Sequence, residues 1–257
     1  MIKKKNIAIF TSTRSDIAIL STLIEKLNKS KKIKCLLFVH GTHLERKYGY
    51  TINEIKKLKF KITKSFNNDS LRDDEFGQVQ SLNKIQSEVN NIFKTYTIDG
   101  VIILGDRLER LPIVSACIAY RKIIIHLHGG EITLGAIDEQ IRHMISKAAH
   151  LHFVIADEYK KNLLKMGENK KIIYNYGSLG VEKTLKFLNK NETKKNLAIL
   201  TFHPETVYEN FDWKEKFTTI IKALDKFYYD VIVTAPGFEK NSKKNIFFIK
   251  KHLKNKK

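Results

Sequence analysis

The sequence predicts an α/β fold, namely a doubly wound parallel sheet with helices on both faces. Short runs of apolar, β-branched residues recur along the 257 residues, and longer amphipathic segments separate them. Runs that are apolar throughout are typical of parallel strands, which are buried on both faces. Strands that alternate with helices in this way join into one sheet through right-handed crossovers.

Six strand candidates and five helix candidates alternate before residue 188. The strands are Ile7–Thr11, Ile33–Val39, Gly100–Leu104, Lys122–Leu127, Leu151–Ile155 and Ile172–Tyr176. The helices are Ile17–Leu27, Asp74–Lys94, Arg110–Tyr120, Glu139–Ala148 and Glu158–Met166. Aspartate is a favoured N-cap, so we expect Asp16 to cap the first helix and Asp157 the last.

A second unit follows a polar stretch, residues 188–196, which we interpret as an interdomain linker. The sequence thus predicts one Rossmann-like domain over residues 1–187 and another over residues 197–257. The second contains strands Leu197–Phe202 and Asp230–Thr234 and helices Lys214–Lys226 and Ile246–Leu253. Two strands are few for a doubly wound domain, so we expect this second domain to be incomplete.

The composition limits the classes of partner. The formal net charge of +20 comes mainly from dispersed lysines. This excess is best explained as a general lysine bias, although it also suits an anionic small substrate such as a nucleotide diphosphate. The lack of a nucleic-acid motif predicts no specific nucleic-acid partner. No apolar run is long enough to span a bilayer, and the N-terminus lacks a signal-peptide core, so we expect a cytoplasmic protein without a membrane partner. Cys35 and Cys117 lie in apolar runs and are expected to be buried thiols.

Residues 11–16, TSTRSD, follow the first strand candidate. Ligands of open α/β sheets bind beyond the carboxyl ends of the strands, and backbone N–H groups here, together with Arg14, would suit a phosphate. Taken alone, the segment is better explained as an ordinary capped turn. It lacks the glycine fingerprint of dinucleotide binding, so no redox cofactor is predicted.

Acidic residues and histidines follow the later strands. Asp106, after Gly100–Leu104, is either an acid or base or a helix N-cap. Strand alternation is expected to place His126 and His128 on one face of the sheet, ahead of a Gly-Gly turn and Glu131.

Asp138 lies beyond the same turn, so the segment indicates proton transfer near neutral pH. A metal site is the alternative for the His-x-His pair, but further ligands are not evident, and no metal is predicted. His203, past the strand Leu197–Phe202, is placed to hold a phosphate. The remaining candidates, His143, His150 and His152, are expected to be structural.

Together these segments resemble the UDP-N-acetylglucosamine 2-epimerase family, and most closely its hydrolysing branch. The matching stretches, in family order, are residues 11–16, 41–44 with 48–51, 105–109, 126–131, 135–143 and 201–205. The resemblance implies two Rossmann-like domains arranged as in GT-B glycosyltransferases, with the active site in the cleft. It also implies a sugar-nucleotide substrate, either UDP-GlcNAc or a related diacetamido sugar, for sialic or legionaminic acid synthesis.

The reaction that the resemblance implies is loss of the C2 proton, elimination of the nucleoside diphosphate to a glycal, and addition of water with inverted C2 configuration. No cofactor and no metal are implied, and a homodimer is suggested. The catalytic residues implied are Asp106, His128, Glu131 and Asp138, and the substrate-binding residues are Arg14, His43, Arg107, Arg142 and His203. His128 stands where the family often has glutamate, so the resemblance leaves either His128 or Glu131 as the base.

Family members continue past residue 257 with a glycine- and serine-rich phosphate loop and a glutamate that holds the ribose. Residues 236–257 contain no such loop. We therefore expect a truncated frame or a fragment, with poor stability and little turnover alone. The alternative functions are an inactive sugar-nucleotide-binding remnant and a GT-B glycosyltransferase.

Overall fold

The structure is a computed structural model that describes residues 4–68, 74–185, 196–203, 212–227, 230–234 and 242–253. The chain divides into two compact units: residues 1–133 with 138–188, and residues 134–137 with 189–257. Of the expected linker, residues 188–196, only Asn196 lies within the described part. The linker and the domain limits therefore stay predictions.

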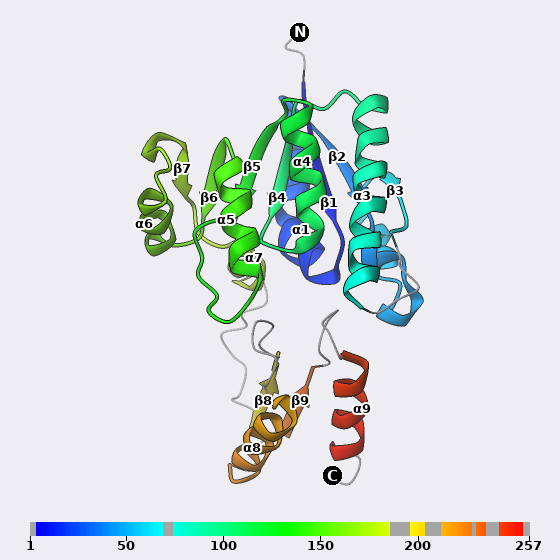
Figure 1. Cartoon of the computed structure of the whole chain (residues 1–257), viewed down its shortest axis with the longest axis vertical. Helices are drawn as coiled ribbons and strands as arrows, with labels where there is room; N and C mark the ends of the chain where they lie inside the picture. Colours follow the sequence, from blue (N-terminus) through cyan, green and yellow to red (C-terminus); the bar gives the residue numbers. More distant parts are fainter. Residues whose placement is uncertain are drawn as a thin grey trace. The chain divides into compact units, whose positions relative to one another are not determined.

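The first unit is built on a seven-stranded sheet in which every strand pair is parallel (Figure 1). Its strands are β1 (Lys5–Thr11), β2 (Ile33–Val39), β3 (Ile62–Ser65), β4 (Gly100–Leu104), β5 (Ile123–Leu127), β6 (Leu151–Val154) and β7 (Ile173–Asn175). The strand order β3-β2-β1-β4-β5-β6-β7 confirms the doubly wound α/β fold. The order reverses between β1 and β4, and such a switch point is where these sheets bind ligands.

Helices cover both faces of this sheet. They are α1 (Arg14–Lys29), α2 (Ile52–Lys57), α3 (Glu75–Thr95), α4 (Leu111–Ala119), α5 (Asp138–Ala148), α6 (Asp157–Lys165) and α7 (Leu179–Leu185). Short 3₁₀ turns are η1 (Gly41–Leu44), η2 (Arg46–Tyr48), η3 (Leu108–Arg110) and η4 (Lys170–Ile172). Alternate residues of β1 pack on opposite faces: Ala8 and Phe10 join the cluster under α3, α4 and α5, and Ile9 joins the cluster under α1 and α2.

Two helix caps differ from the sequence prediction. The N-cap of α1 is Thr13, and Asp16 is the third helical residue, whose carboxylate completes a capping box with Thr13. The N-cap of α6 is Ala156, and Asp157 is the first residue of the helix. Asp16 and Asp157 are therefore not N-caps. Asp16 is the third residue of its helix and Asp157 is the first, and at both positions an acidic side chain still interacts favourably with the helix dipole.

Three elements of the first unit were not predicted. Strand β3 has only four residues at the sheet edge, with partly exposed side chains, so it lacks a continuous apolar run. Helices α2 and α7 are six and seven residues long, too short for a clear amphipathic period.

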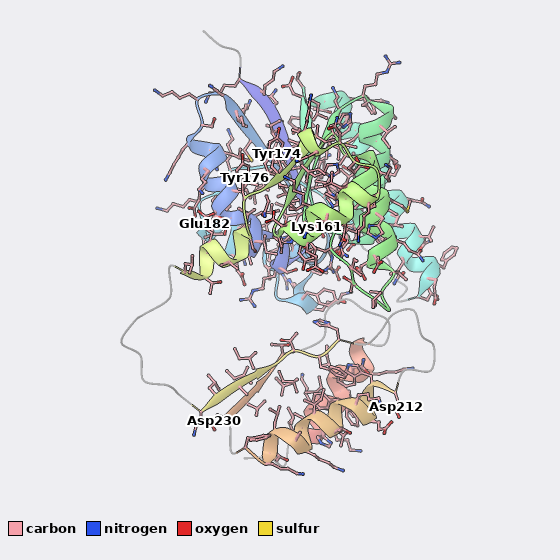
Figure 2. The ribbon with its side chains drawn as sticks, turned by 90° about the vertical axis from the view of Figure 1, so that its left-hand side faces the viewer. Lys161, Tyr174, Tyr176, Glu182, Asp212 and Asp230 are labelled. Atoms are coloured by element: carbon pink, nitrogen blue, oxygen red, sulfur yellow. The ribbon has the colours of Figure 1, made fainter. Side chains whose placement is uncertain are left out.

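The other edge of the sheet, β7, carries stacked aromatic rings. Tyr174 and Tyr176 (Figure 2) stack with ring centroids 6.1 Å apart. Tyr174 also stacks on Phe153 of β6, with ring centroids 5.4 Å apart. Phe153 and Tyr174 are paired residues of neighbouring strands, so their rings pack together on one face of the sheet.

The second unit contains the parallel pair β8 (Leu197–Leu200) and β9 (Asp230–Val233) with helices α8 (Trp213–Asp225) and α9 (Ser242–Leu253). Trp213, Phe217 and Ile249 form its core between the helices and one sheet face. On the strands, Ile199 and Ile232 are 69% and 52% exposed. All four elements were predicted, with limits within four residues.

Across both units, no helix of the described part is long and apolar enough to cross a membrane. Cys35 and Cys117 are free thiols. Cys117 is buried as expected, whereas Cys35 is only partly buried. Burial raises the pKa of Cys35 to about 11 and that of Cys117 to about 12, so neither is a reactive thiolate near neutral pH.

Candidate active site

The turn from β1 into α1 is closed by the carboxylate of Asp16. Its Oδ2 accepts the backbone N–H groups of Ser12 and Thr13, at 2.9 and 3.1 Å, and the Ser12 hydroxyl at 3.1 Å. These two N–H groups were candidates from the sequence for binding a phosphate, but in the structure they already donate hydrogen bonds to Asp16. Arg14 points elsewhere, and its Nε donates to Glu54 at 3.1 Å on an exposed surface.

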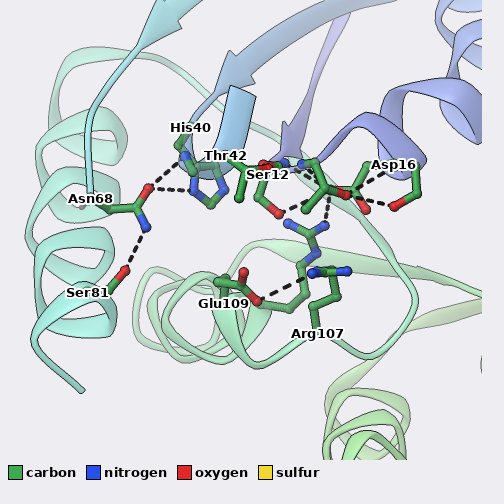
Figure 3. A network of polar contacts seen from close by, with 12 residues as sticks. Ser12, Asp16, His40, Thr42, Asn68, Ser81, Arg107 and Glu109 are labelled. Atoms are coloured by element: carbon green, nitrogen blue, oxygen red, sulfur yellow. Dashed lines mark hydrogen bonds and ion pairs between the residues drawn. The ribbon is translucent and has the colours of Figure 1, made fainter. Parts of the chain in front are cut away.

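A buried ion pair lies behind this turn (Figure 3). Nη2 of Arg110, at the end of η3, donates to Oδ2 of Asp16. Burial by itself raises the pKa of Asp16, but the charges of Arg110 and Arg107 and the hydrogen bonds hold it well below its usual range. Asp16 is thus ionised, and its partner Arg110 is a residue that the sequence analysis missed.

Two buried histidines follow β2. His43 lies between hydroxyls, with Nε2 2.9 Å from Oγ1 of Thr11 and Nδ1 2.7 Å from Oγ1 of Thr51. His40 was not singled out from the sequence; its Nδ1 is 3.2 Å from Oδ1 of Asn68. Burial lowers the pKa of His43 to about 4 and that of His40 to about 3, so both are neutral.

The turn after β5 holds the second group of site residues. His126 is buried; its Nε2 lies 2.9 Å from the Gly105 carbonyl and its Nδ1 3.1 Å from the Ser146 hydroxyl. Because a carbonyl only accepts, Nε2 carries the proton. Burial lowers the pKa of His126 to about 3, which suits a structural link between β4, β5 and α5 better than proton transfer.

His128 departs from the strand alternation on which its orientation was predicted. Strand β5 ends at Leu127, and His128 has φ 65°, in the left-handed region. Its Nδ1 lies 2.8 Å from Oε1 of Glu131, and its Nε2 is buried without a hydrogen-bond partner in the described chain. Strained backbone of this kind concentrates at functional sites.

Arg142 of α5 connects the two strand ends. Its Nη1 donates to the Glu131 carbonyl at 2.8 Å, and its Nη2 donates to Thr133 Oγ1 at 3.1 Å and to the Asp106 carboxylate. Asp106 is not a helix N-cap, which was one of the two alternatives from the sequence. The N-cap of η3 is Arg107, and Asp106 pairs with Arg142. Arg142 thereby joins Asp106, at the end of β4, to the His128–Glu131 turn, at the end of β5.

Asp138 and Arg107 belong to the same electrostatic environment. Burial raises the pKa of Asp138, and the charge of Asp106 raises it further, against the opposing effect of Arg107 and Arg142. Burial by itself lowers the pKa of Arg107, but the charges of the surrounding carboxylates raise it above its usual value. They belong to Glu109, Asp16, Asp138 and Asp106.

The structure thus brings together most, but not all, of the predicted site residues. Asp106, His128, Glu131, Asp138, Arg107 and Arg142 form one network, whereas Arg14 lies apart on the surface. His203 belongs to the second unit, and of the matching stretch 201–205 the last two residues lie outside the described part.

The other histidines have protein partners. His143 pairs with Glu139 at 3.6 Å, His152 pairs with Glu168 at 3.3 Å, and Nδ1 of His150 accepts the Ile124 N–H at 3.2 Å. Among the residues that the structure describes, no three His, Cys, Asp or Glu side chains gather as a metal site would require.

Comparison with known proteins gives a consistent result. Residues 25–255 match the family described as UDP-N-acetylglucosamine 2-epimerase. A Campylobacter jejuni protein named GDP/UDP-N,N'-diacetylbacillosamine 2-epimerase (hydrolyzing) is 38% identical, over 86% of this chain and 60% of its own length. A Legionella pneumophila protein named UDP-N,N'-diacetylbacillosamine 2-epimerase (hydrolyzing) is 31% identical, over 87% of this chain and 61% of its own length.

This chain therefore spans about three-fifths of the length of these curated relatives. Among solved structures, UDP-GlcNAc 2-epimerase from Neisseria meningitidis bound to UDP-GlcNAc is similar with a TM-score of 0.75 and 18% identity. The similarity covers 98% of this chain and 70% of the other. At this identity it shows a shared fold.

Proposed function

We propose, from the premise that this chain belongs to the UDP-N-acetylglucosamine 2-epimerase family, that it carries out hydrolysing 2-epimerisation of a nucleotide-linked 2-acetamido sugar. The names of the two relatives at 38% and 31% identity favour a diacetamido sugar linked to UDP or GDP. UDP-N-acetylglucosamine is the second candidate substrate, which the description of the matching family favours.

The proposed reaction has two stages and balances without a redox partner. A base takes the proton from C2, the C2–H electron pair forms the C1=C2 bond, and the C1–O bond breaks so that the nucleoside diphosphate leaves with its electron pair. Water then adds across the double bond: its oxygen bonds to C1, and a proton reaches C2 on the opposite face. The product is the free 2-epimer of the sugar.

The observation that carries this proposal is the guanidinium of Arg142. It contacts the Asp106 carboxylate and the Glu131 carbonyl, and so assembles acidic and histidine side chains from two strand ends beside the switch point of the sheet. Removing a proton from one face of a carbon and returning a proton to the other face requires at least two titratable groups held at fixed positions near that carbon. The network supplies them.

The two aspartates lie in different environments. Asp106 pairs with the guanidinium of Arg142. The pKa of Asp138 is raised by burial and by the charge of Asp106, which favours its protonated form. A carboxyl group whose environment raises its pKa is a typical proton donor. We assign Asp138 as the proton donor and Asp106 as the partner of Arg142.

Arg107 is the proposed diphosphate-binding group of the first unit, since its guanidinium is charged and its side chain 32% exposed. Arg14 remains a proposed contact to the same group, and His203 remains a proposed phosphate contact of the second unit. His43 holds Thr11 and Thr51 with its two ring nitrogens, so we propose that it shapes the substrate site from beneath the β1 turn. The free thiols of Cys35 and Cys117 support a reducing compartment, the cytoplasm.

The test is proton NMR of the purified chain in deuterated water, with UDP- and GDP-linked diacetamido sugars and with UDP-N-acetylglucosamine in separate samples. We expect slow formation of a free 2-epimer deuterated at C2, together with nucleoside diphosphate, and the fastest turnover with a diacetamido substrate. Transfer of the sugar to an added acceptor, or unchanged substrate from folded protein, would contradict the proposal. Asp106→Asn is the matched inactive control because it keeps the size of the side chain.

A further inference from the structure

The contact between His128 and Glu131 determines which nitrogen of the imidazole carries a proton. Nδ1 of His128 lies 2.8 Å from Oε1 of Glu131. An ionised carboxylate only accepts hydrogen bonds, so Nδ1 is the donor. In the neutral ring, Nε2 then has a free lone pair and is the only basic atom of the side chain.

Within the described part of the chain, that lone pair has no competing partner. Nε2 of His128 is buried and makes no hydrogen bond to any part of the chain that the structure describes. A buried polar atom without a partner is costly and is expected where a ligand or a transferred proton supplies the missing interaction. The Glu131 carboxylate, in contrast, is already engaged by the imidazole.

The backbone holds the pair in this arrangement. His128 adopts φ 65°, and its N–H donates to the Phe153 carbonyl at 3.0 Å. A Cβ on Gly129 would lie 2.9 Å from Nδ1 of His126, and one on Gly130, which has φ 79°, would lie 2.3 Å from the Tyr159 carbonyl oxygen. Only glycine fits at both positions, so the turn returns Glu131 to His128 in one conformation.

The turn is also fixed from outside. Arg142 bonds the Glu131 carbonyl, and Nδ2 of Asn162 donates to the Gly130 carbonyl at 2.9 Å. The same arginine bonds Asp106, so the His128 ring and the Asp106 carboxylate are held by one rigid connection. A base must be held within about 0.5 Å of its productive position, and these contacts meet that need.

We infer, resting on the proposed function, that Nε2 of His128 accepts the C2 proton of the substrate and that Glu131 is a positioning residue that sets the imidazole tautomer. In the first stage the C2–H bond breaks, the proton bonds to Nε2, and the electron pair forms the glycal double bond as the nucleoside diphosphate leaves. Glu131 stabilises the imidazolium that results and does not itself take the proton.

The experiment compares His128→Gln and Glu131→Ala for the rate of deuterium incorporation at C2, with His143→Gln as the control. His143 is a partly exposed histidine that also pairs with a glutamate, Glu139, but stands outside the network. We expect His128→Gln to lose about 100-fold or more, as general bases contribute. Glu131→Ala should lose roughly tenfold in kcat with KM unchanged, because part of the ring population still presents a free Nε2.

A second measurement does not depend on activity. Nitrogen-15 NMR of histidine-labelled protein, at a pH where the rings are neutral, reports which ring nitrogen carries the proton. We expect the Nδ1–H tautomer for His128 in the wild type, and a shift toward Nε2–H in Glu131→Ala with no change in His143→Gln.

The outcomes separate the two proposals. A folded wild type that incorporates no deuterium with any of the substrates would overturn the proposed function. A wild type that turns over, while His128→Gln keeps its rate and Glu131→Ala loses it, would make Glu131 the base and overturn this inference alone. An Nε2–H tautomer in the wild type would also overturn it.

Discussion

Arg110 bonds Asp16 across 94 positions of the chain, and the two side chains are 1% and 6% exposed. The contact ties the loop after β4 to the turn after β1, so it spans the switch point of the sheet. Asp16 in turn holds the backbone of Ser12 and Thr13. One ion pair thereby fixes the relative position of two of the loops that border the candidate site.

Arg110→Met is expected to lower the free energy of unfolding by about 3–5 kcal/mol, because it leaves the Asp16 carboxylate buried without its partner. Urea denaturation followed by circular dichroism measures this. The double variant Asp16→Asn with Arg110→Met should cost clearly less than the sum of the two single variants, since no uncompensated charge remains. Additive losses would show that the pair is not energetically coupled.

The buried histidines predict a loss of stability in mild acid. His40, His43 and His126 have pKa values lowered to about 3, 4 and 3, whereas unfolded histidine titrates near 6.5. Between the folded and unfolded pKa values, the unfolded state binds more protons than the folded state. The contribution of the three neutral histidines to the free energy of unfolding is therefore fully present above about pH 6.5, and it is lost as pH falls toward the folded-state pKa values. The maximum slope for three protons is about 4 kcal/mol per pH unit.

Urea denaturation at pH 7, 6 and 5 tests this. His126→Gln should be less stable than the wild type at pH 7 but should show a shallower pH dependence, because one of the three groups no longer titrates. His150→Gln provides the control, since His150 is exposed. An unchanged slope in His126→Gln would contradict the role of His126 burial.

The sheet could be predicted from the sequence because its central strands are apolar on both faces, as the burial of all five residues of β4 shows. Edge strand β3 could not, because four half-exposed residues leave no such run. Asp106, Glu131 and Asp138 could be found because ligands of this fold bind at strand ends, where these residues lie.

Other features of the site depend on tertiary contacts that no local pattern shows. Arg110 looks like an exposed basic residue until Asp16, far away in the sequence, is placed beside it. The orientation predicted for His128 from strand alternation was wrong, because the strand ends at Leu127 and His128 has a left-handed backbone. The caps of α1 and α6 were missed because hydrogen-bond geometry, not residue type, decides which residue begins a helix.

Gly130→Ala is expected to destabilise the protein by about 3 kcal/mol or more, because the new Cβ combines a left-handed backbone with a 2.3 Å approach to the Tyr159 carbonyl. Gly167→Ala is the matched control. Gly167 has φ 85° but nothing within 4 Å of its added Cβ, so only the backbone cost of about 1–2 kcal/mol applies. Thermal and urea denaturation compare the two, and equal losses would contradict the close approach at Gly130.

Arg142→Lys is expected to lower kcat at least tenfold while the protein remains folded. The guanidinium serves three acceptors at once, on Asp106, Glu131 and Thr133, with its side chain only 4% exposed. A lysine ammonium keeps the charge but is a point donor without the planar fork, so it holds one strand end and releases the other. A misplacement of about 1 Å at a reacting group costs on the order of 100-fold in rate.

The rate of deuterium incorporation at C2 measures the loss, and circular dichroism checks the fold. Arg121→Lys, at an exposed position after α4, is the control and should match the wild type. Because Asp106 keeps a cation nearby in Arg142→Lys, a fall in kcat would identify geometry, and not charge, as the contribution of Arg142. Wild-type kcat in Arg142→Lys would instead show that a positive charge beside Asp106 suffices.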